Sequence, residues 1–184
     1  MKIFFCRHGE TQWNKQSKLQ GHLDSPLTEK GILQAKQLGQ HLAQQQPQLI
    51  ITSDLGRAIS TAELLNEFLN VSIEVSSLLR ERCFGELQGL SRIDTELEHK
   101  TLWHAYDARF NSNQIAITNA ESATAVLARI ERFFASIEML KLNTVVVIGH
   151  GEWLRVLQNV VNGLAPWSNR QPVPENCGYF EFTL

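Results

Sequence analysis

The chain contains 184 residues, and its 17 basic and 19 acidic side chains give a formal net charge of −2. This length fits one domain that can bury a full hydrophobic core without the support of disulfides or a structural metal. A hydrophobic fraction of 43% and a charged fraction of 20% are typical of a globular protein and exclude a disordered or fibrous chain. Because the charge is nearly balanced, the sequence does not indicate a basic surface for binding nucleic acid or a polybasic patch for binding a membrane.

Neither secretion nor membrane insertion is indicated by the sequence. The apolar start over residues 1–5 gives way at once to polar residues, so it is too short for the core of a signal peptide. No apolar run approaches the roughly 18 residues of a membrane span, and we expect a cytoplasmic protein. The cysteines, Cys6, Cys83 and Cys177, lack CxxC spacing, and we expect buried reduced thiols rather than disulfides or a zinc site.

Three strands and two helices are predicted in the first part of the chain. Residues 2–6 and 49–52 are short apolar runs typical of buried strands, and residues 71–75 predict a third strand. Thr28 is placed to cap the first helix, and Ser53-Asp54 carry N-cap chemistry for the second. The apolar positions at helical spacing are Ile32, Ala35, Leu38 and Leu42, then Leu55, Ile59, Ala62, Leu65 and Leu69.

The second part of the chain starts with its least regular stretch, residues 81–119. Thr118 and Glu121 fit a capping box that opens a long amphipathic helix. Residues 144–148 are apolar throughout and predict a strand buried on both faces, while residues 178–184 predict a terminal strand. The apolar positions of the long helix are Ala123, Val126, Ile130, Phe133 and Ile137, and those of a last helix are Trp153, Val156, Leu157 and Val160.

This alternation of strands and helices predicts an α/β fold. We expect a three-layer α/β/α sandwich in which helices cover both faces of a mostly parallel sheet. In such folds, ligands bind outside the carboxyl ends of the strands. The residues that follow each predicted strand are therefore the first place to look for function.

Histidine and arginine side chains follow three of the predicted strands. Arg7-His8-Gly9 comes after the first strand, Arg57 lies shortly after the second, and Gly149-His150-Gly151 follows the most apolar one. A single histidine or arginine in such a place is weak evidence, but their convergence on one sheet edge indicates an anion site. Arg57 also lies in the first turn of its helix, where the helix dipole disfavours a cation, so we expect an anion at that helix end.

These strand ends belong to a longer series of motifs. Residues 5–11, Phe-Cys-Arg-His-Gly-Glu-Thr, resemble the signature of the histidine phosphatase superfamily, whose fold is shared by cofactor-dependent phosphoglycerate mutase. The resemblance spans nearly the whole chain and implies a phosphoglycerate mutase-like fold. The other matching motifs are Trp13-Asn14, Leu19-Gln20-Gly21, Ser25-Pro26-Leu27-Thr28, Ser53-Asp54-Leu55-Gly56-Arg57, Leu79-Arg80-Glu81-Arg82, Phe84-Gly85, Gln88-Gly89 and Gly149-His150-Gly151.

The resemblance also implies roles for individual residues. It makes His8 the nucleophile that takes the phosphoryl group and Glu81 the proton donor. The groups that would hold phosphate oxygens are Arg7, Arg57 and His150, with Asn14 as a further donor, and those that would complete the pocket rim are Gln20, Gly21 and the backbone of Gly151. Arg82 matches a second basic position that some members use to bind substrate.

The chemistry of these side chains agrees with the implied roles. A neutral imidazole can attack phosphorus directly, provided that its other ring nitrogen donates a hydrogen bond to a carbonyl. Two guanidinium groups and a cationic His150 would match the charge of a phosphomonoester without any metal or cofactor. Glu81 lies between Arg80 and Arg82, which would lower its pKa, and we expect burial and the substrate dianion to oppose them.

For several other residues we expect a place on the surface or in the core and no direct role in the site. We expect His22, His41, His99 and His104 to be surface residues, and Trp13 and Trp153 to belong to the core. Glu152 departs from the family pattern because a carboxylate after the His-Gly pair would repel anionic substrates if it faced the pocket. We expect it to point outward at the start of its helix, where the dipole favours it.

The segment around residues 90–119 separates the candidate activities. It is a short, lid-like insertion within a single domain that spans residues 1–184, and it lacks the adjacent arginines with which true mutases bind a substrate carboxylate. We therefore expect a metal-independent phosphatase that acts on a small phosphorylated metabolite, with water as the acceptor. A phosphoglycerate mutase and a catalytically silent phospho-ligand binding module remain alternatives, and the chain is a monomer or a homodimer.

Overall fold

Five strands form one sheet in the order β3-β2-β4-β1-β5, in a computed structural model that describes residues 1–113 and 116–184. Strands β1 (Lys2–Arg7), β2 (Leu49–Ser53), β3 (Ser72–Ser76) and β4 (Thr144–Gly149) pair in parallel. Strand β5 (Tyr179–Thr183) joins the edge of β1 in the antiparallel direction. The predicted strands and the mostly parallel sheet are confirmed.

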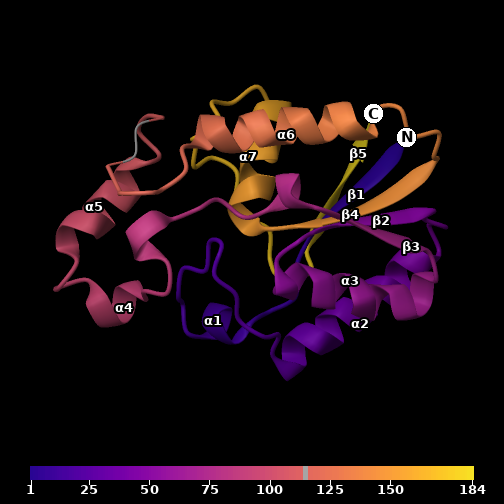
Figure 1. Cartoon of the computed structure of the whole chain (residues 1–184), viewed down its shortest axis with the longest axis horizontal. Coiled ribbons are helices and arrows are strands. Elements are labelled where there is room, and N and C mark those ends of the chain that lie inside the picture. The colour runs from indigo at the N-terminus through magenta and orange to yellow at the C-terminus, as the bar shows by residue number, and fades with distance from the viewer. Residues whose placement is uncertain (114–115) are drawn as a thin grey trace.

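Two pairs of helices cover the two faces of this sheet (Figure 1). Helices α2 (Glu29–Ala43) and α3 (Gly56–Leu69) pack on one face, and α6 (Ala123–Ile137) and α7 (Gly151–Val161) pack on the other. The structure is therefore the expected three-layer sandwich. The amino and carboxyl termini lie close together, since the Met1 amino group donates to the carbonyl oxygen of Leu184 at 2.9 Å.

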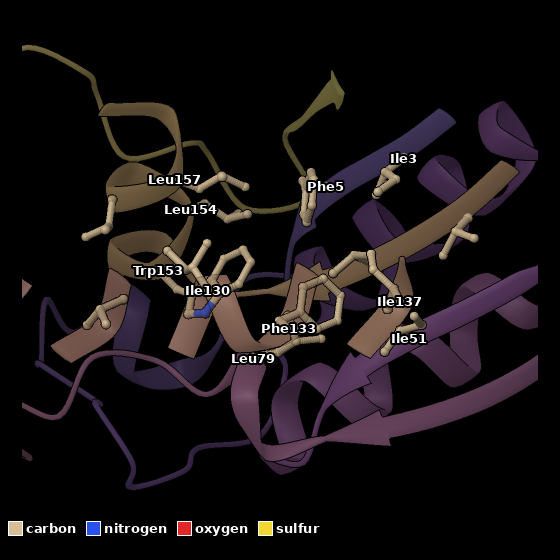
Figure 2. Packing of buried hydrophobic residues seen from close by; sticks show 14 of the residues in the cluster. Ile3, Phe5, Ile51, Leu79, Ile130, Phe133, Ile137, Trp153, Leu154 and Leu157 are labelled. Carbon is tan, nitrogen blue, oxygen red and sulfur yellow. The ribbon is translucent and has the colours of Figure 1, made fainter. Parts of the chain in front are cut away.

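Strand β1 is buried on both faces, and this fixes the residues that follow it. Phe4 packs into the core beneath α2 and α3, whereas Phe5 faces the core beneath α6 and α7. The Phe5 ring lies 5.9 Å from the ring of Trp153, which in turn lies 6.0 Å from Phe133 (Figure 2). The end of β1, and with it His8, is thereby held against the start of α7.

The insertion lies beyond the three layers, at the far left of Figure 1. It contains α4 (Arg92–Thr95) and α5 (Lys100–Ala108), and it packs around a small apolar cluster of its own. The cluster consists of Phe84, Leu87, Trp103 and Ile117. The remaining short elements are α1 (Gln12–Lys15) and the 3-10 turns η1 (Ser77–Leu79) and η2 (Gly85–Leu87).

Helix starts are where the sequence predictions were wrong. Helix α6 is capped by Ser122, whose side chain accepts from the backbone of Ala125, and not by Thr118. Glu121 is absent from the predicted capping box because it forms an ion pair with Arg129 at 2.8 Å.

Helix α3 also starts differently, because it begins at Gly56 with no cap from its own N-cap residue. The Ser53 hydroxyl oxygen accepts from the backbone N–H of Leu55, which precedes the helix, and Asp54 binds Arg80 instead. Asp24, from another segment, accepts a hydrogen bond from the backbone N–H of Arg57 at this helix start.

Most predicted core residues are buried, with a few exceptions. Ile32 and Val160 are 40% and 38% exposed although they were expected on buried helix faces. Cys6 is buried, whereas Cys83 and Cys177 are only half-buried, and all three are free thiols as expected. Among the described helices, none combines the length and apolar character needed to cross a membrane.

The position of the α6 cap can be tested by a pair of substitutions. Ser122→Ala is expected to lower the free energy of unfolding by about 1 kcal/mol, because a backbone N–H of the first turn loses its acceptor. Thr118→Ala is the control, since Thr118 is exposed and lies outside the helix, and it should change stability little. Urea unfolding followed by circular dichroism measures both, and a larger loss for Thr118→Ala would contradict the assigned cap.

Candidate active site

A cavity of about 160 Å³ opens at the carboxyl ends of the central strands. Parallel pairing of β1 with β4 places Arg7 beside Gly149, so the residues that follow both strands meet. The rings of His8 and His150 lie 5.1 Å apart as a result. The lining residues are Arg7, His8, Asn14, Lys18, Leu19, Gln20, Gly21, Arg57, Glu81, Phe84, Tyr106, Gly151, Glu152 and Val173.

His8 is held as a neutral imidazole with one nitrogen free. Its Nδ1 lies 2.7 Å from the carbonyl oxygen of Gly9, which can only accept, so Nδ1 carries the proton and Nε2 keeps its lone pair. Burial, assisted by the charges of Arg57 and Arg7, lowers the pKa of His8 well below its usual range. The imidazole is therefore ready to act as a nucleophile at neutral pH.

His150 shares this protonation state in the unliganded protein. Burial lowers its pKa well below the usual range, with Arg57 and then His8 adding to the effect. Its two ring nitrogens are buried and have no hydrogen-bond partner in the described part of the chain. The cationic form expected from the sequence is that of His150 beside a bound phosphomonoester, whose charge would favour the protonated ring.

Arg57 is held in place by a loop from the first third of the chain. It is 1% exposed, and its guanidinium donates to the carbonyl oxygens of Gly21 and Leu23, both at 2.8 Å. The carboxylate of Asp24 pairs with the same group at 3.0 Å and also accepts from the Arg57 backbone N–H. Asp24 therefore supplies a carboxylate at the start of α3, where the sequence predicts an anion.

Arg7 is fixed in a similar way from the other side of the chain. Its Nη1 donates to the carbonyl oxygen of Pro174 at 2.7 Å. The Nε atoms of Arg7 and Arg57 are both buried without a partner among the described residues. These N–H groups are available to an anion in the cavity.

Asn14 is oriented by three donors. Its Oδ1 accepts from the backbone and the hydroxyl of Thr11 at 3.1 and 3.0 Å, and from Nδ2 of Asn176 at 3.2 Å. This arrangement commits the oxygen and leaves the Asn14 Nδ2 as a donor on the cavity side. Asn176 also donates to the carbonyl oxygen of His8, which sequence reasoning missed because the two lie 168 residues apart.

Gln20, Gly21 and Gly151 line the cavity as the resemblance implied. The Oε1 of Gln20 is buried without a partner among the described residues. Gly21 has a φ of +54°, which favours glycine, and a Cβ at Gly151 would come within 2.6 Å of Val173. A side chain at position 21 would therefore strain the backbone, and a side chain at position 151 would clash with Val173, so glycine suits both positions.

Glu81 lies at the start of α7, at the edge of the cavity. Its carboxylate accepts from the backbone N–H groups of Arg82, Glu152 and Trp153 at 2.9 to 3.2 Å. Burial raises the pKa of Glu81, and the charge of Glu152 raises it further, against these hydrogen bonds and Arg57. Arg80 does not contribute, because it binds Asp54 at 2.8 Å.

The backbone of Glu81 is held by two side chains that sequence reasoning did not assign. His22 Nε2 donates to the Glu81 carbonyl oxygen at 2.8 Å, so the expectation that His22 is a surface residue without a role was wrong. Arg129 donates to the carbonyl oxygens of Leu78 and Arg80, both at 2.9 Å. No local pattern marks either residue, since both contacts join segments far apart in sequence.

Glu152 is the largest departure from expectation. Glu152 is among the lining residues and is 6% exposed, so the prediction that it points outward was wrong. It is surrounded by three guanidinium groups, those of Arg155 in direct contact, Arg82 at 3.6 Å and Arg109 at 3.7 Å. Arg82, expected as a substrate-binding residue, is not among the lining residues and contacts Glu152 instead.

Comparison with known protein families identifies the family of this chain. The family model of the histidine phosphatase superfamily (branch 1) matches residues 3–184. The chain belongs to this superfamily. In the described part of the chain, no group of three or more histidine, cysteine, aspartate or glutamate side chains is placed to hold a metal ion.

Relatives within the superfamily carry both mutase and phosphatase names. The probable phosphoglycerate mutase GpmB of Salmonella arizonae is 34% identical over 179 residues, which cover 96% of this chain and 82% of that protein. The mycobacterial glucosyl-3-phosphoglycerate phosphatase in complex with VO3 has a TM-score of 0.88 at 28% identity, over 99% and 90% of the two chains. The α-ribazole phosphatase of Shigella flexneri has a TM-score of 0.86 at 29% identity, over 100% and 91%.

The neutral state of the histidines has a measurable consequence for stability. As the pH falls below about 6.5, the unfolded chain binds protons that native His8 and His150 do not, so the free energy of unfolding decreases. The slope reaches at most about 1.4 kcal/mol per pH unit for each histidine. Urea unfolding between pH 5 and pH 8 measures it.

The His150→Asn variant isolates one of the two contributions. Glu81 titrates in both proteins, so the difference in slope reports His150 alone, and the variant is expected to have the shallower slope. His104→Asn, on the exposed side of α5, should keep the wild-type slope. Equal slopes for wild type and His150→Asn would mean that His150 is already charged in the native protein.

Proposed function

We propose that this protein is a metal-independent phosphatase that hydrolyses small phosphomonoesters through a phosphohistidine on His8. The observation that carries the proposal is a set of buried polar atoms without partners around a free imidazole nitrogen. These atoms are Nε of Arg7, Nε of Arg57 and both ring nitrogens of His150. Each such atom costs roughly 1–3 kcal/mol in a folded protein, a cost that a bound phosphate group removes.

The first step transfers the phosphoryl group to the protein. Nε2 of His8 attacks phosphorus and forms the N–P bond while the bond to the ester oxygen breaks. Glu81, whose raised pKa favours the protonated form, gives its proton to the leaving oxygen. Arg7 and Arg57 stabilise the charge on the three phosphoryl oxygens.

The second step releases phosphate. Glu81, now a carboxylate, takes a proton from water, and the water oxygen forms a bond to phosphorus as the N–P bond breaks. The products are inorganic phosphate and the starting imidazole, and Glu81 again carries its proton. One carboxyl group thus serves as acid and base in turn, with no net change in the protein.

Water is the favoured acceptor because no basic residue in the described part of the insertion is among the lining residues, so none is placed to bind a substrate carboxylate. Arg109, the buried arginine of the insertion, contacts Glu152 and is not among the lining residues. The mutase-named relatives keep phosphoglycerate mutase as the second candidate. Product analysis with 3-phosphoglycerate separates the two, since a mutase forms its isomer and a phosphatase forms inorganic phosphate.

The nucleophile can be tested directly. His8→Ala is expected to reduce hydrolysis of p-nitrophenyl phosphate by at least about a thousandfold, because the covalent route is lost. Wild-type protein quenched in acid-free denaturant during turnover should carry one phosphoryl group in mass spectrometry, and His8→Ala should carry none. The reaction is run with EDTA present.

Two outcomes would contradict the proposed mechanism. Retained activity in His8→Ala would remove His8 as the nucleophile, and loss of activity with EDTA would show that a metal is needed. His41→Ala is the matched control, since His41 is exposed, lies 2.7 Å from the Tyr179 hydroxyl and is not among the lining residues. Tight phosphate binding by wild type without any turnover would instead support a silent binding module.

Glu81 is tested by varying the leaving group. Glu81→Gln is expected to slow hydrolysis of an alkyl phosphate by about 10²–10⁴-fold, because the departing alkoxide needs a proton. The loss for p-nitrophenyl phosphate should be much smaller, since nitrophenolate departs without one. The alkaline limb of kcat/KM for the alkyl ester should also vanish in the variant. Equal losses for both esters would remove Glu81 as the acid.

A further inference from the structure

One wall of the cavity consists of Glu152, Tyr106 and Phe84. We propose that Glu152 determines substrate specificity, and that it selects esters whose alcohol part carries neutral hydroxyl groups and disfavours esters with a second anionic group. The inference rests on the phosphatase proposed above and names the class of its substrate. None of these three residues belongs to the groups that hold the phosphoryl oxygens.

The position of Glu152 follows from its contact with the proton donor. Its backbone N–H binds the Glu81 carboxylate at 3.1 Å, and both residues line the same cavity. Since Glu81 must reach the leaving oxygen, the Glu152 side chain lies near the carbon atoms that follow that oxygen. It therefore meets the alcohol part of the substrate and not the phosphoryl group.

Three arginines fix the Glu152 carboxylate from behind. Arg155 contacts both of its oxygens, Arg82 lies 3.6 Å from Oε2 and Arg109 lies 3.7 Å from Oε1. Such a group is a charged hydrogen-bond acceptor with a fixed orientation, because its own rotation would break one of these contacts. A hydroxyl group on the substrate can donate to it directly.

The arginines themselves are not presented to the substrate. Arg109 lies 3.3 Å from the centre of the Tyr106 ring and donates to the Tyr106 carbonyl oxygen, while Arg82 donates to the carbonyl oxygen of Glu121. None of the three arginines lines the cavity within the described chain. A substrate carboxylate at this wall would thus meet the oxygens of Glu152, acceptor against acceptor, and not the N–H groups of these three arginines.

The aromatic residues complete the wall. The rings of Phe84 and Tyr106 lie 5.8 Å apart in an edge-to-face arrangement, and both line the cavity. Aromatic surface beside a few fixed polar groups is the usual composition of a small-molecule site, in which the polar groups set orientation. Rings beside a carboxylate suit a polyol or sugar, whose C–H groups contact the rings while its hydroxyls donate to the acceptor.

Two esters that differ at one carbon test this inference. In sn-glycerol 1-phosphate the terminal carbon carries a hydroxyl group, and in D-3-phosphoglycerate, which has the same configuration at its central carbon, the terminal carbon is a carboxylate. We expect wild type to have a kcat/KM at least about tenfold higher for the glycerol ester. Glu152→Gln should reduce this ratio about tenfold, and a general loss of activity does not affect a ratio.

Two further variants separate charge from structure. Glu152→Asp keeps the charge and should keep the preference for the glycerol ester. Glu67→Gln removes a carboxylate of α3 that pairs with Lys36 at 2.9 Å, far from the lining residues, and should leave both activity and ratio unchanged. An unchanged ratio in folded Glu152→Gln would overturn the inference.

Wild type alone decides the matter if Glu152→Gln does not fold. Equal or reversed preference between the two esters would overturn the proposed specificity while leaving the phosphatase intact. If no ester is hydrolysed, including p-nitrophenyl phosphate, the proposed function fails. Calorimetric binding of the two esters to His8→Ala still tests the inference then, with tighter binding of the glycerol ester expected and equal binding contradicting it.

Discussion

The site depends on the burial of its titratable groups beside two guanidinium groups, those of Arg7 and Arg57. Their charges lower the pKa values of His8 and His150, which burial alone already lowers, so both imidazoles stay neutral until an anion arrives. Glu81 is buried beside the same cations, yet burial and the neighbouring Glu152 raise its pKa. The pKa shifts of His8 and Glu81 are thus in the directions that favour a neutral imidazole and a carboxylic acid, the two states that the proposed phosphoryl transfer from an ester requires.

The sequence could predict those parts of the site that depend on the local pattern of residues along the chain. Apolar strand runs and helical spacing are local signals, and parallel strands bring their carboxyl ends to one edge, so His8 and His150 were placed together correctly. Asp24, His22 and Asn176 could not be found in this way. Each acts through a hydrogen bond between loops that are distant in sequence, and nothing in its own neighbourhood distinguishes it from an exposed polar residue.

Glu152 shows how a local rule is overridden. The helix dipole favours a carboxylate in the first turn of α7 whether it points outward or inward, and water is usually the better environment for a charge. Here Arg82, Arg109 and Arg155 supply an alternative to water, although they are never adjacent in sequence. The same error affected the insertion, whose arginines were judged by adjacency along the chain while Arg109 acts together with residues 27 and 46 positions away. The capping of α6 by Ser122 instead of Thr118 has a related cause, because Glu121 is engaged by Arg129.

These observations divide the site into two parts with different structural origins. The groups for phosphoryl transfer follow β1 and β4, whose burial on both faces leaves little freedom to move them. The wall that meets the alcohol part comes from the insertion, through Tyr106, and from the outer side of the α7 start, through Glu152. A change in the insertion can therefore alter which ester fits without disturbing the chemistry. This separation gives a physical reason why proteins of one fold, such as the mycobacterial and Shigella flexneri phosphatases, bear the names of different substrates.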